Sequence, residues 1–376
     1  MPIPFHILKE APIDRAVDLL LFEAADAEAS ELIFEPSEKN AVVRMRRDGM
    51  LHDVFRHPTP AHEGVLRRLK ELARLRESAP LSAQSAPLRR VVDNASLEGQ
   101  FAVVPLLEGE KGLLRLRPSR RQLQDLGFSD EERQRILRIL RRPTGLLLLV
   151  GPRHSGVTTT LHALLEASLA SRTRATLIED RGEAEIVGVT QEEVDVVSGR
   201  TYSALARAAF ARGAEVIGIG ALRDEATAAV VASAAEHRLV IAVVEATTAS
   251  QALGRLLDLR IDPRRMSIVL NGVLTQRLVR RTCTRCLRRE TVTLEYARAS
   301  EWPRGFTRAF FGKEKERSVA RGGKCDACRF TGHQGQIGVF ELLDLTAGRR
   351  ARVSLREDAI GKAHSGMIAP EEALRL

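Results

Sequence analysis

A glycine-rich stretch, GPRHSGVTTT at residues 151–160, has almost every residue of a phosphate-binding loop. The pattern G-x-x-x-x-G-K-[ST] presents backbone N–H groups and a helix N-terminus to phosphate, and its lysine reaches the terminal phosphates. Here Val157 stands in the lysine position, while Thr158 offers the hydroxyl that would bind Mg²⁺. Because valine carries no charge, we expect weak binding of ATP and Mg²⁺ and poor hydrolysis. The predicted nucleotide-binding residues are Gly151, Ser155, Gly156, Val157, Thr158 and Thr159.

The four cysteines all fall in two C-x-x-C pairs, Cys283/Cys286 and Cys325/Cys328. Two intervening residues let both thiolates of a pair point at one tetrahedral metal ion, so the pattern predicts a structural Zn²⁺ site. A closed four-thiolate site leaves no position for a substrate, and we therefore expect no catalysis there. A redox-active pair is the alternative, although neither pair lies in a thioredoxin-like βαβ context.

The glycine-rich stretch has the sequence surroundings that a phosphate loop requires. LLLLV at 146–150 predicts a short buried strand, and residues 159–170 carry leucines on one helical face, which predicts a helix after the loop. Alternating strands and helices beyond this point predict an α/β fold with a mostly parallel sheet covered by helices. Further apolar strands are expected at 175–180, 215–220 and 239–244.

The first 120 residues predict a small separate α/β domain. Asp48-Gly49 is a hairpin signal between two strands, and the stretch 77–98 has no clear period, which predicts a loop. Residues 121–128 form a predicted linker, and Ser129 with Glu132 predicts a capping box that opens a second domain over 129–376. In the first domain, helices are expected at 12–27 and 61–76, and strands at 31–36, 41–46, 101–107 and 112–117.

The composition of the 376-residue chain limits its partners and its surroundings. Its net charge is +9, and basic runs such as RLVRRTCTRCLRR at 277–289 are compatible with an anionic partner, although a solvated arginine-rich surface is the preferred explanation. Aromatic residues make up 4%, so the cores are expected to be aliphatic. No signal peptide opens the chain and no apolar run approaches the roughly 20 residues that cross a bilayer. We predict a cytoplasmic chain, with peripheral contact to the inner face of the membrane left open.

Several further motifs, taken jointly, resemble the type II secretion ATPases and the type IV pilus assembly and retraction ATPases. The resemblance covers almost the whole chain and implies a RecA-like P-loop domain preceded by a small PAS-like α/β domain. It also implies a zinc-binding insertion at 281–332 and C-terminal helices at 345–376. The motifs are TLIEDRGE (176–183), GALRDEATA (220–228), LTQRLVRRTC (274–283) and CRFTGHQGQIGVFELL (328–343).

This family consists of hexameric motors, so the resemblance also implies partners. We expect a homo-hexamer, or a hetero-hexamer with an active paralogue, beside an inner-membrane platform protein. Nucleic acid is not an expected partner, because aromatic stacking residues are scarce around the basic runs and the family resemblance explains the cysteines. Residue 12 already resembles the start of the second of the family's usual domains, and the family's N-terminal docking domain is expected to be absent.

The chain departs from the family's catalytic pattern at several points. The Asp box keeps Glu179, Asp180 and Glu183, and Glu179 is the candidate residue for orienting a water. The Walker B glutamate is replaced by Ala221, and the His-box histidine by Glu245, an acid that would repel a phosphate. The arginines that a first domain supplies to its neighbour look absent from PLSAQSAP at 80–87 and GQFAV at 99–103.

These joint changes predict a subunit or regulator in which hydrolysis is lost or severely impaired. Two alternatives stay open on the residues alone. One is an active but unorthodox motor, with Arg153 or a neighbouring subunit supplying charge, and the other is a nucleic-acid-binding zinc protein. Glu179, Asp180 and Thr158 can equally be residues kept for folding, at a strand end and a helix N-terminus.

Overall fold

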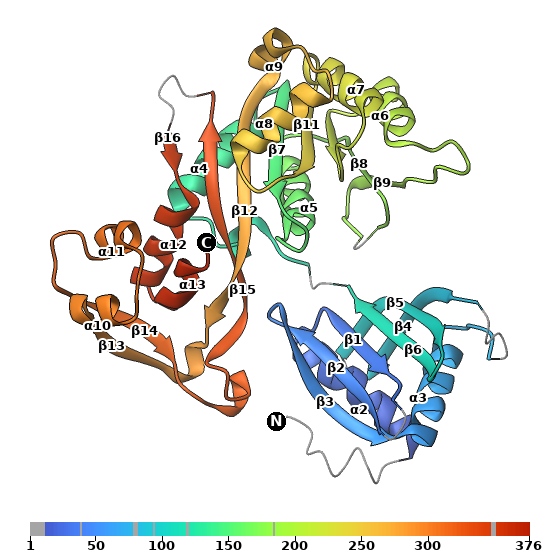
Figure 1. Ribbon diagram of the computed structural model, residues 1–376. Helices are drawn as coiled ribbons and strands as arrows, with labels where there is room; N and C mark the ends of the chain where they lie inside the picture. The colour runs from blue at the N-terminus through green and yellow to red at the C-terminus, as the bar shows by residue number, and fades with distance from the viewer. Residues whose placement is uncertain are drawn as a thin grey trace. The chain divides into compact units, whose positions relative to one another are not determined.

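The computed structural model describes residues 12–37, 40–77, 82–92, 95–117, 120–182, 185–346 and 351–376. It divides into two compact units (Figure 1). The first combines Met1–Ser119 with two short segments that carry the cysteines, Cys283–Cys286 and Gly323–Gly335. The second contains the rest of the chain. Within the described ranges, no helix has the length and apolar character needed to cross a membrane.

The first unit is built on a six-stranded antiparallel sheet in the order β3-β2-β1-β6-β5-β4. The apolar sides of two amphipathic helices pack against the sheet, and together they form one core cluster that includes Leu20, Phe34 and Phe101. Asp48 and Gly49 both have positive φ and form the predicted turn between β2 and β3. The elements are α2 (Ile13–Asp26), β1 (Glu31–Glu35), β2 (Asn40–Arg47), β3 (Met50–Pro58), α3 (Thr59–Leu72), β4 (Gln84–Val92), β5 (Ala95–Leu106) and β6 (Gly109–Leu116).

The predicted loop over 77–98 is wrong for most of its length. Gln84–Val92 forms β4, which pairs with β5 in a continuous antiparallel ladder. The sequence has no alternation there because β4 is an edge strand, where Pro87 is tolerated and few side chains must be apolar. Leu88, which is fully buried, anchors the strand to the core.

The second unit contains an eight-stranded sheet in the order β16-β15-β12-β7-β11-β10-β8-β9. Each consecutive pair of strands from β12 to β9 is parallel, which confirms the predicted α/β class and parallel-rich sheet. The strand β7 is apolar and buried along its whole length, as expected for a central parallel strand. The strands are β7 (Gly145–Gly151), β8 (Ala175–Glu179), β9 (Val189–Glu193), β10 (Val216–Ile219), β11 (Leu239–Glu245), β12 (Leu270–Thr282), β15 (His333–Asp344) and β16 (Ala351–Val353).

Helices cover both faces of this sheet. On one face, Leu147 and Leu149 of β7 share a cluster with residues of α4 and α5; on the other, Leu146 and Leu148 share a cluster with residues of α6, α7 and α8. The predicted capping box is present, because the Ser129 hydroxyl accepts from the Glu132 N–H and the Glu132 carboxylate accepts from the Ser129 N–H. The helices are α4 (Asp130–Leu140), α5 (Val157–Ser168), α6 (Tyr202–Ala211), α7 (Glu225–Ala235), α8 (Ala249–Asp258) and α9 (Pro263–Val269).

Aromatic residues are concentrated in the segment between the cysteine pairs, so the expectation of aliphatic cores fails there. Trp302 makes edge-to-face contacts with Phe306 and Phe310, with ring centroids 5.5 and 5.4 Å apart. These rings share a buried cluster with residues of the C-terminal helices. The elements are β13 (Leu287–Thr293), α10 (Leu294–Ala299), α11 (Arg304–Phe311), β14 (Glu316–Gly322), α12 (Leu355–His364) and α13 (Pro370–Leu374).

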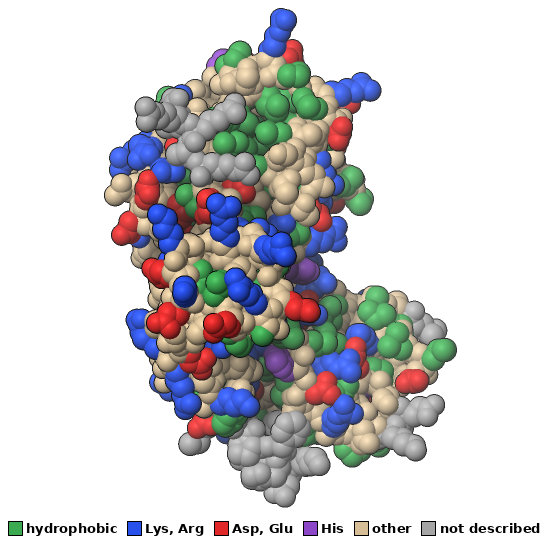
Figure 2. Space-filling view, turned by 60° about the vertical axis from the view of Figure 1, so that its left-hand side comes forward, with side chains coloured by type: hydrophobic (Ala, Val, Ile, Leu, Met, Phe, Trp, Pro, Cys, Tyr) green, Lys and Arg blue, Asp and Glu red, His purple; other side chains and the backbone are tan. Residues whose placement is uncertain are grey.

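Charged side chains of both signs are interspersed on the face shown in Figure 2. Part of the basic run 277–289 has partners within the second unit. Arg280 donates to the buried carboxylate of Glu372, and Arg277 donates to the carbonyl of Thr247 at 2.7 Å. These two arginines therefore have structural roles, and the run is not a uniform basic surface.

A buried histidine pair lies in the first unit. The rings of His57 and His62 are stacked with centroids 5.5 Å apart, and both side chains are almost fully buried. His62 donates through Nε2 to the Glu110 carbonyl at 2.8 Å, whereas His57 Nε2 and His62 Nδ1 are buried without a partner among the described residues. Burial lowers the pKa of both histidines below the usual 6.5, because a charged imidazole would lose its hydration there.

We expect this pair to make the first unit acid-labile. The unfolded chain binds more protons than the folded chain once the pH falls below 6.5, so the free energy of unfolding decreases through that range. His62→Gln keeps an amide donor for Glu110 and should flatten the dependence. Hydrogen exchange of α3 peptides in urea, measured from pH 7.5 to pH 5, checks this, with the exposed His237→Gln as control. Equal slopes in wild type and His62→Gln would contradict it.

Candidate nucleotide and cysteine sites

The carboxyl ends of four parallel strands bring the predicted catalytic positions to one edge of the second sheet. The glycine loop follows β7, Glu179 ends β8, Gly220 follows β10 and Glu245 ends β11. Glu245 is paired in register with Gly151 of the neighbouring β7. This edge is where parallel α/β sheets bind ligands, because the loops there diverge and helix N-termini point at the same space.

The glycine loop has the backbone shape of a phosphate loop. Gly156 has φ of 81° and directly precedes α5, which begins at Val157. A Cβ atom on Gly151 would lie 2.1 Å from the Ser155 hydroxyl, so only glycine fits at that position. His154 adopts a φ of 64°, a left-handed conformation that is uncommon outside glycine.

A buried amide that sequence reasoning missed holds this loop to the neighbouring strand β12. Gln276 Nε2 donates to the Ser155 carbonyl at 2.8 Å, and Gln276 Oε1 accepts from the Thr160 hydroxyl at 2.6 Å. Gln276 and Thr160 are both buried. Little in the sequence signals this contact, because β12 carries other polar residues, among them Asn271, Thr275 and Arg277.

The predicted nucleotide-binding side chains lie around the start of α5. Ser155 is buried and its hydroxyl has no partner among the described residues, while Thr158 and Thr159 are half-buried on the first helical turn. Val157 packs against the cluster formed by α4, α5 and the sheet. The lysine position therefore contributes to the hydrophobic core and places no charge near the loop.

The arginine inside the loop has a carboxylate partner. Arg153 Nε lies 3.3 Å from a carboxylate oxygen of Glu245, and both side chains are exposed, by 81% and 54%. Glu245 is the acid at the predicted His-box position. The Glu245 carboxylate thus forms an ion pair with the guanidinium of Arg153, the loop residue that would otherwise supply positive charge to a bound phosphate.

Glu179, the candidate catalytic residue, is 4% exposed and already engaged. His162 of α5 places Nε2 at 3.1 Å from one carboxylate oxygen, and Gln191 donates to the other at 3.4 Å. The neighbouring Asp180 accepts from Arg223 at 2.6 Å. The predicted Glu183 lies outside the described residues.

The position of the Walker B glutamate is filled by a buried methyl group. Ala221 is 8% exposed and belongs to the core cluster under α6 and α7. Asp224 caps α7, because its carboxylate accepts from the Thr227 N–H at 2.8 Å and from the Thr227 hydroxyl at 2.7 Å. No carboxylate comes from position 221 to hold a cation near Thr158.

The four cysteines lie together in the first unit, with all four sulfur atoms within 4.8 Å of one another. The sulfur pairs Cys283–Cys325, Cys286–Cys328 and Cys325–Cys328 are 3.9, 3.7 and 3.6 Å apart. A tetrahedral Zn²⁺ with four thiolates has sulfur–sulfur separations of about 3.8 Å, whereas a disulfide bond is about 2.0 Å long. The four thiols therefore fit one metal ion and are not disulfide-bonded.

The protein environment prepares these cysteines unequally for ionisation. Burial opposes ionisation of Cys328, but backbone hydrogen bonds at Cys325 and Gly332 and the neighbouring thiols lower its pKa to about 6. Burial and hydrogen bonding to the other three cysteines raise the pKa of Cys286 to about 12. The Gly332 N–H donates to Cys328 Sγ at 3.3 Å, a contact that stabilises thiolate.

A parallel sheet with a glycine loop and a helix N-terminus at its carboxyl edge defines the class of P-loop proteins. A family model described as Type II/IV secretion system protein matches residues 7–367. The chain belongs to this family, as the motif resemblance predicted.

Relatives in this family come from two kinds of machine. The chain is 32% identical over 391 residues to the type II secretion system protein E of Pseudomonas aeruginosa, covering 98% of this chain and 76% of the relative. It is 29% identical over 400 residues to the type IV pilus assembly ATPase PilB of Thermus thermophilus, covering 100% of this chain and 44% of the relative.

Solved structures support the fold. The Legionella pneumophila ATPase DotB has a TM-score of 0.68 at 13% identity, covering 97% of this chain and 95% of that one. The pilus retraction motor PilT with bound ADP has a TM-score of 0.59 at 18% identity, covering 95% and 96%. The RecA-like P-loop prediction is confirmed at the level of the fold, while the PAS-like assignment of the first unit stays a prediction.

We expect the Gln276 amide to hold the glycine loop in place without nucleotide. Gln276→Leu removes both hydrogen bonds and leaves the Ser155 carbonyl and Thr160 hydroxyl unpaired in the interior. The cost should be about 1–3 kcal/mol of unfolding free energy. Chemical denaturation of the nucleotide-free protein measures it, with Thr159→Ala, one residue away from Thr160, as control. Unchanged stability of Gln276→Leu would contradict this role.

Proposed function

We propose that this chain is a subunit or regulator of a type II secretion or type IV pilus-like machine in which ATP hydrolysis is lost or severely impaired. The observation that carries the proposal is that three residues at the carboxyl edge of the second sheet are all unsuited to hydrolysis. Val157 is partly buried against the core, Ala221 is buried, and Glu245 places a carboxylate beside the glycine loop.

Electrostatics explains why these three changes act in the same direction. Phosphoryl transfer develops negative charge that lysine, Mg²⁺ and arginine normally offset. Here the lysine and the Walker B acid are gone, and Arg153, the cation of the loop itself, is paired with Glu245. The loop keeps its backbone N–H groups and the α5 N-terminus, which are sufficient for weak binding of an anion such as ATP. The proposal therefore gives the loop weak ATP binding without ATP hydrolysis.

The alternative is an active, unorthodox hexameric motor that powers pilus assembly, retraction or secretion. The observation in its favour is Glu179, a buried carboxylate next to His162 at the end of β8. In that reading Glu179 orients the attacking water, and Arg153 or a neighbouring subunit supplies the missing charge. The same contacts serve equally to secure α5 on β8, which is the role our proposal gives them.

Membership of this family supports a role for the chain beside other components of such a machine. We infer assembly as a homo-hexamer, or as a hetero-hexamer with an active paralogue, on the cytoplasmic side of an inner-membrane platform protein. An active paralogue would supply the hydrolysis that this edge lacks. The relatives named as type II secretion and type IV pilus proteins support the kind of machine.

We assign Zn²⁺ as the structural metal of the four-cysteine site. The sulfur separations of 3.6–3.9 Å match a tetrahedral four-thiolate site. All ligand positions are filled by protein, so the metal would crosslink the segments at 283–286 and 325–328 and would bind no substrate. The thiols of this chain supply the ligands, and the Gly332 N–H stabilises one of them.

A nucleotide titration separates the proposal from its alternative. We expect calorimetry to detect weak ATP binding that Mg²⁺ changes little, because position 221 offers no carboxylate to hold the cation. Turnover should equal the background of a preparation carrying Glu179→Gln. Mg²⁺-dependent turnover that Glu179→Gln abolishes would overturn the proposal and establish the active motor.

Removing the Glu245 charge should strengthen ATP binding. Glu245→Gln frees Arg153 and removes an acid beside the phosphates, which should raise affinity about 2–10-fold. The double variant Arg153→Gln/Glu245→Gln should lose the part of this gain that depends on Arg153. Calorimetric titration measures both, with Glu236→Gln, a surface acid paired with Arg265, as control. An unchanged affinity in Glu245→Gln would contradict this role of the pair.

A further inference from the structure

The cysteine segments are attached to the N-terminal part of the first unit by charged contacts. Arg329 directly follows Cys328, has φ of 50°, and reaches α2. Its guanidinium forms an ion pair with the buried carboxylate of Glu23 and lies 3.9 Å from Asp26. Asp48, at the β2–β3 turn, accepts a hydrogen bond from the backbone of Gly335.

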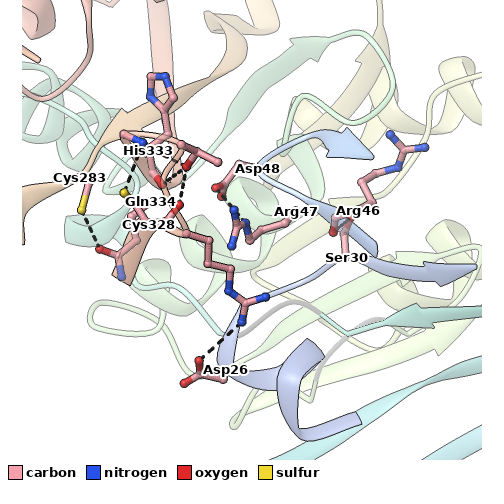
Figure 3. A network of polar contacts seen from close by, with 12 residues as sticks. Asp26, Ser30, Arg46, Arg47, Asp48, Cys283, Cys328, His333 and Gln334 are labelled. Carbon is pink, nitrogen blue, oxygen red and sulfur yellow. Dashed lines mark hydrogen bonds and ion pairs between the residues drawn. The ribbon is translucent and has the colours of Figure 1, made fainter. Parts of the chain in front are cut away.

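Arg47 is an unusual residue at this junction. It is 9% exposed, and its Nε is buried without a hydrogen-bond partner among the described residues. Its nearest acid is Asp48, with Nε and Oδ2 3.7 Å apart, a distance too long for a hydrogen bond. Figure 3 shows that Arg47 and Asp48 lie on the side of β2 toward Cys328, while Arg46 points the other way.

The charges around Arg47 leave its guanidinium only partly compensated in the metal-free protein. Burial and the nearby Arg329 lower the pKa of Arg47, while Asp48, Cys328 and Glu23 act in the opposite direction. Glu23 is already paired with Arg329. A buried cation with one ion pair and no hydrogen bond to its Nε is costly unless another negative group completes its surroundings.

The metal-bound cysteines would be that negative group. Four thiolates around one divalent ion carry a net charge of −2, and this charge would lie at a buried site formed by Cys283 and Cys328. Groups outside the ligand shell that stabilise the ligands tune metal affinity. We propose that Arg47 is the counter-cation of the metal-bound four-thiolate cluster, and that metal binding thereby fastens the β2–β3 turn and α2 to the cysteine segments.

The inference goes beyond the proposed function, because it holds for an active or an inactive ATPase. It gives Arg47 a positioning role: the residue binds no metal but stabilises the charge of the ligands. It also makes the order of the N-terminal region depend on metal. The metal-free protein would leave Arg47 and Arg329 facing each other without a compensating dianion.

The test measures metal affinity directly. Purified full-length protein is loaded with Zn²⁺ and titrated with a chromogenic chelator, and Co²⁺ loading gives the thiolate absorption bands as a second readout. We expect Arg47→Met to weaken metal binding roughly 10–100-fold, as found when outer ligand-supporting groups are removed. Arg47→Lys should retain most of the affinity. Arg46→Met, which removes a neighbouring arginine paired with Glu31, is the matched control and should bind normally.

A second measurement tests whether metal binding holds α2 and the β2–β3 turn to the cysteine segments. Its first part uses the wild-type protein alone, so it does not require a stable variant. Hydrogen exchange of the wild-type protein with and without Zn²⁺ should show metal-dependent protection of α2 and of the β2–β3 turn, beyond that of the cysteine segments. Arg47→Met should reduce this protection. Wild-type metal affinity in Arg47→Met, an equal loss in Arg46→Met, or exchange in α2 and the turn that ignores metal would each overturn the inference.

Discussion

The contact between the Gln276 amide and the glycine loop is the interaction on which the nucleotide edge depends. A phosphate loop normally gains much of its order from the ligand and from a lysine that contacts it. In this chain a protein amide ties the end of the loop and the first turn of α5 to β12, through the Ser155 carbonyl and the Thr160 hydroxyl. The loop can therefore keep its shape while Val157 faces the core. The retention of a P-loop fold and the loss of its charges are compatible for this reason.

Protein contacts take the place of ligand contacts elsewhere along the carboxyl edge of the second sheet as well. Glu179 is held by His162 and Gln191, Asp224 is used as a helix cap, and Glu245 has Arg153. These three acids each have a partner within the protein. These contacts do not depend on a bound nucleotide.

Local patterns predicted most of the fold. Buried strands such as β7, the Asp48-Gly49 turn and the Ser129 capping box are encoded within a few residues, so the sequence was sufficient. The strand β4 was not predictable in this way. Backbone pairing with β5 holds it in the sheet, so its sequence lacks the apolar alternation from which a strand is predicted. The cysteine spacing predicted that the four thiols could share one metal.

Partnerships across long sequence distances were out of reach. Gln276 with Thr160, His162 with Glu179 and Arg153 with Glu245 join side chains that only the parallel sheet brings together. The sequence showed which catalytic residues of the family pattern are replaced. It did not show which side chains the replacing residues contact. The surroundings of Arg47 depend on a cysteine segment more than two hundred positions away, and no local pattern in β2 indicates it.

The placement of the single tryptophan has a practical consequence. Trp302 is packed among Phe306, Phe310 and Phe311, in the segment that separates the two cysteine pairs. Intrinsic tryptophan fluorescence will therefore respond to the melting of this aromatic cluster and report little about the glycine loop or the antiparallel sheet. A single smooth fluorescence transition is consequently no proof that the whole chain unfolds cooperatively.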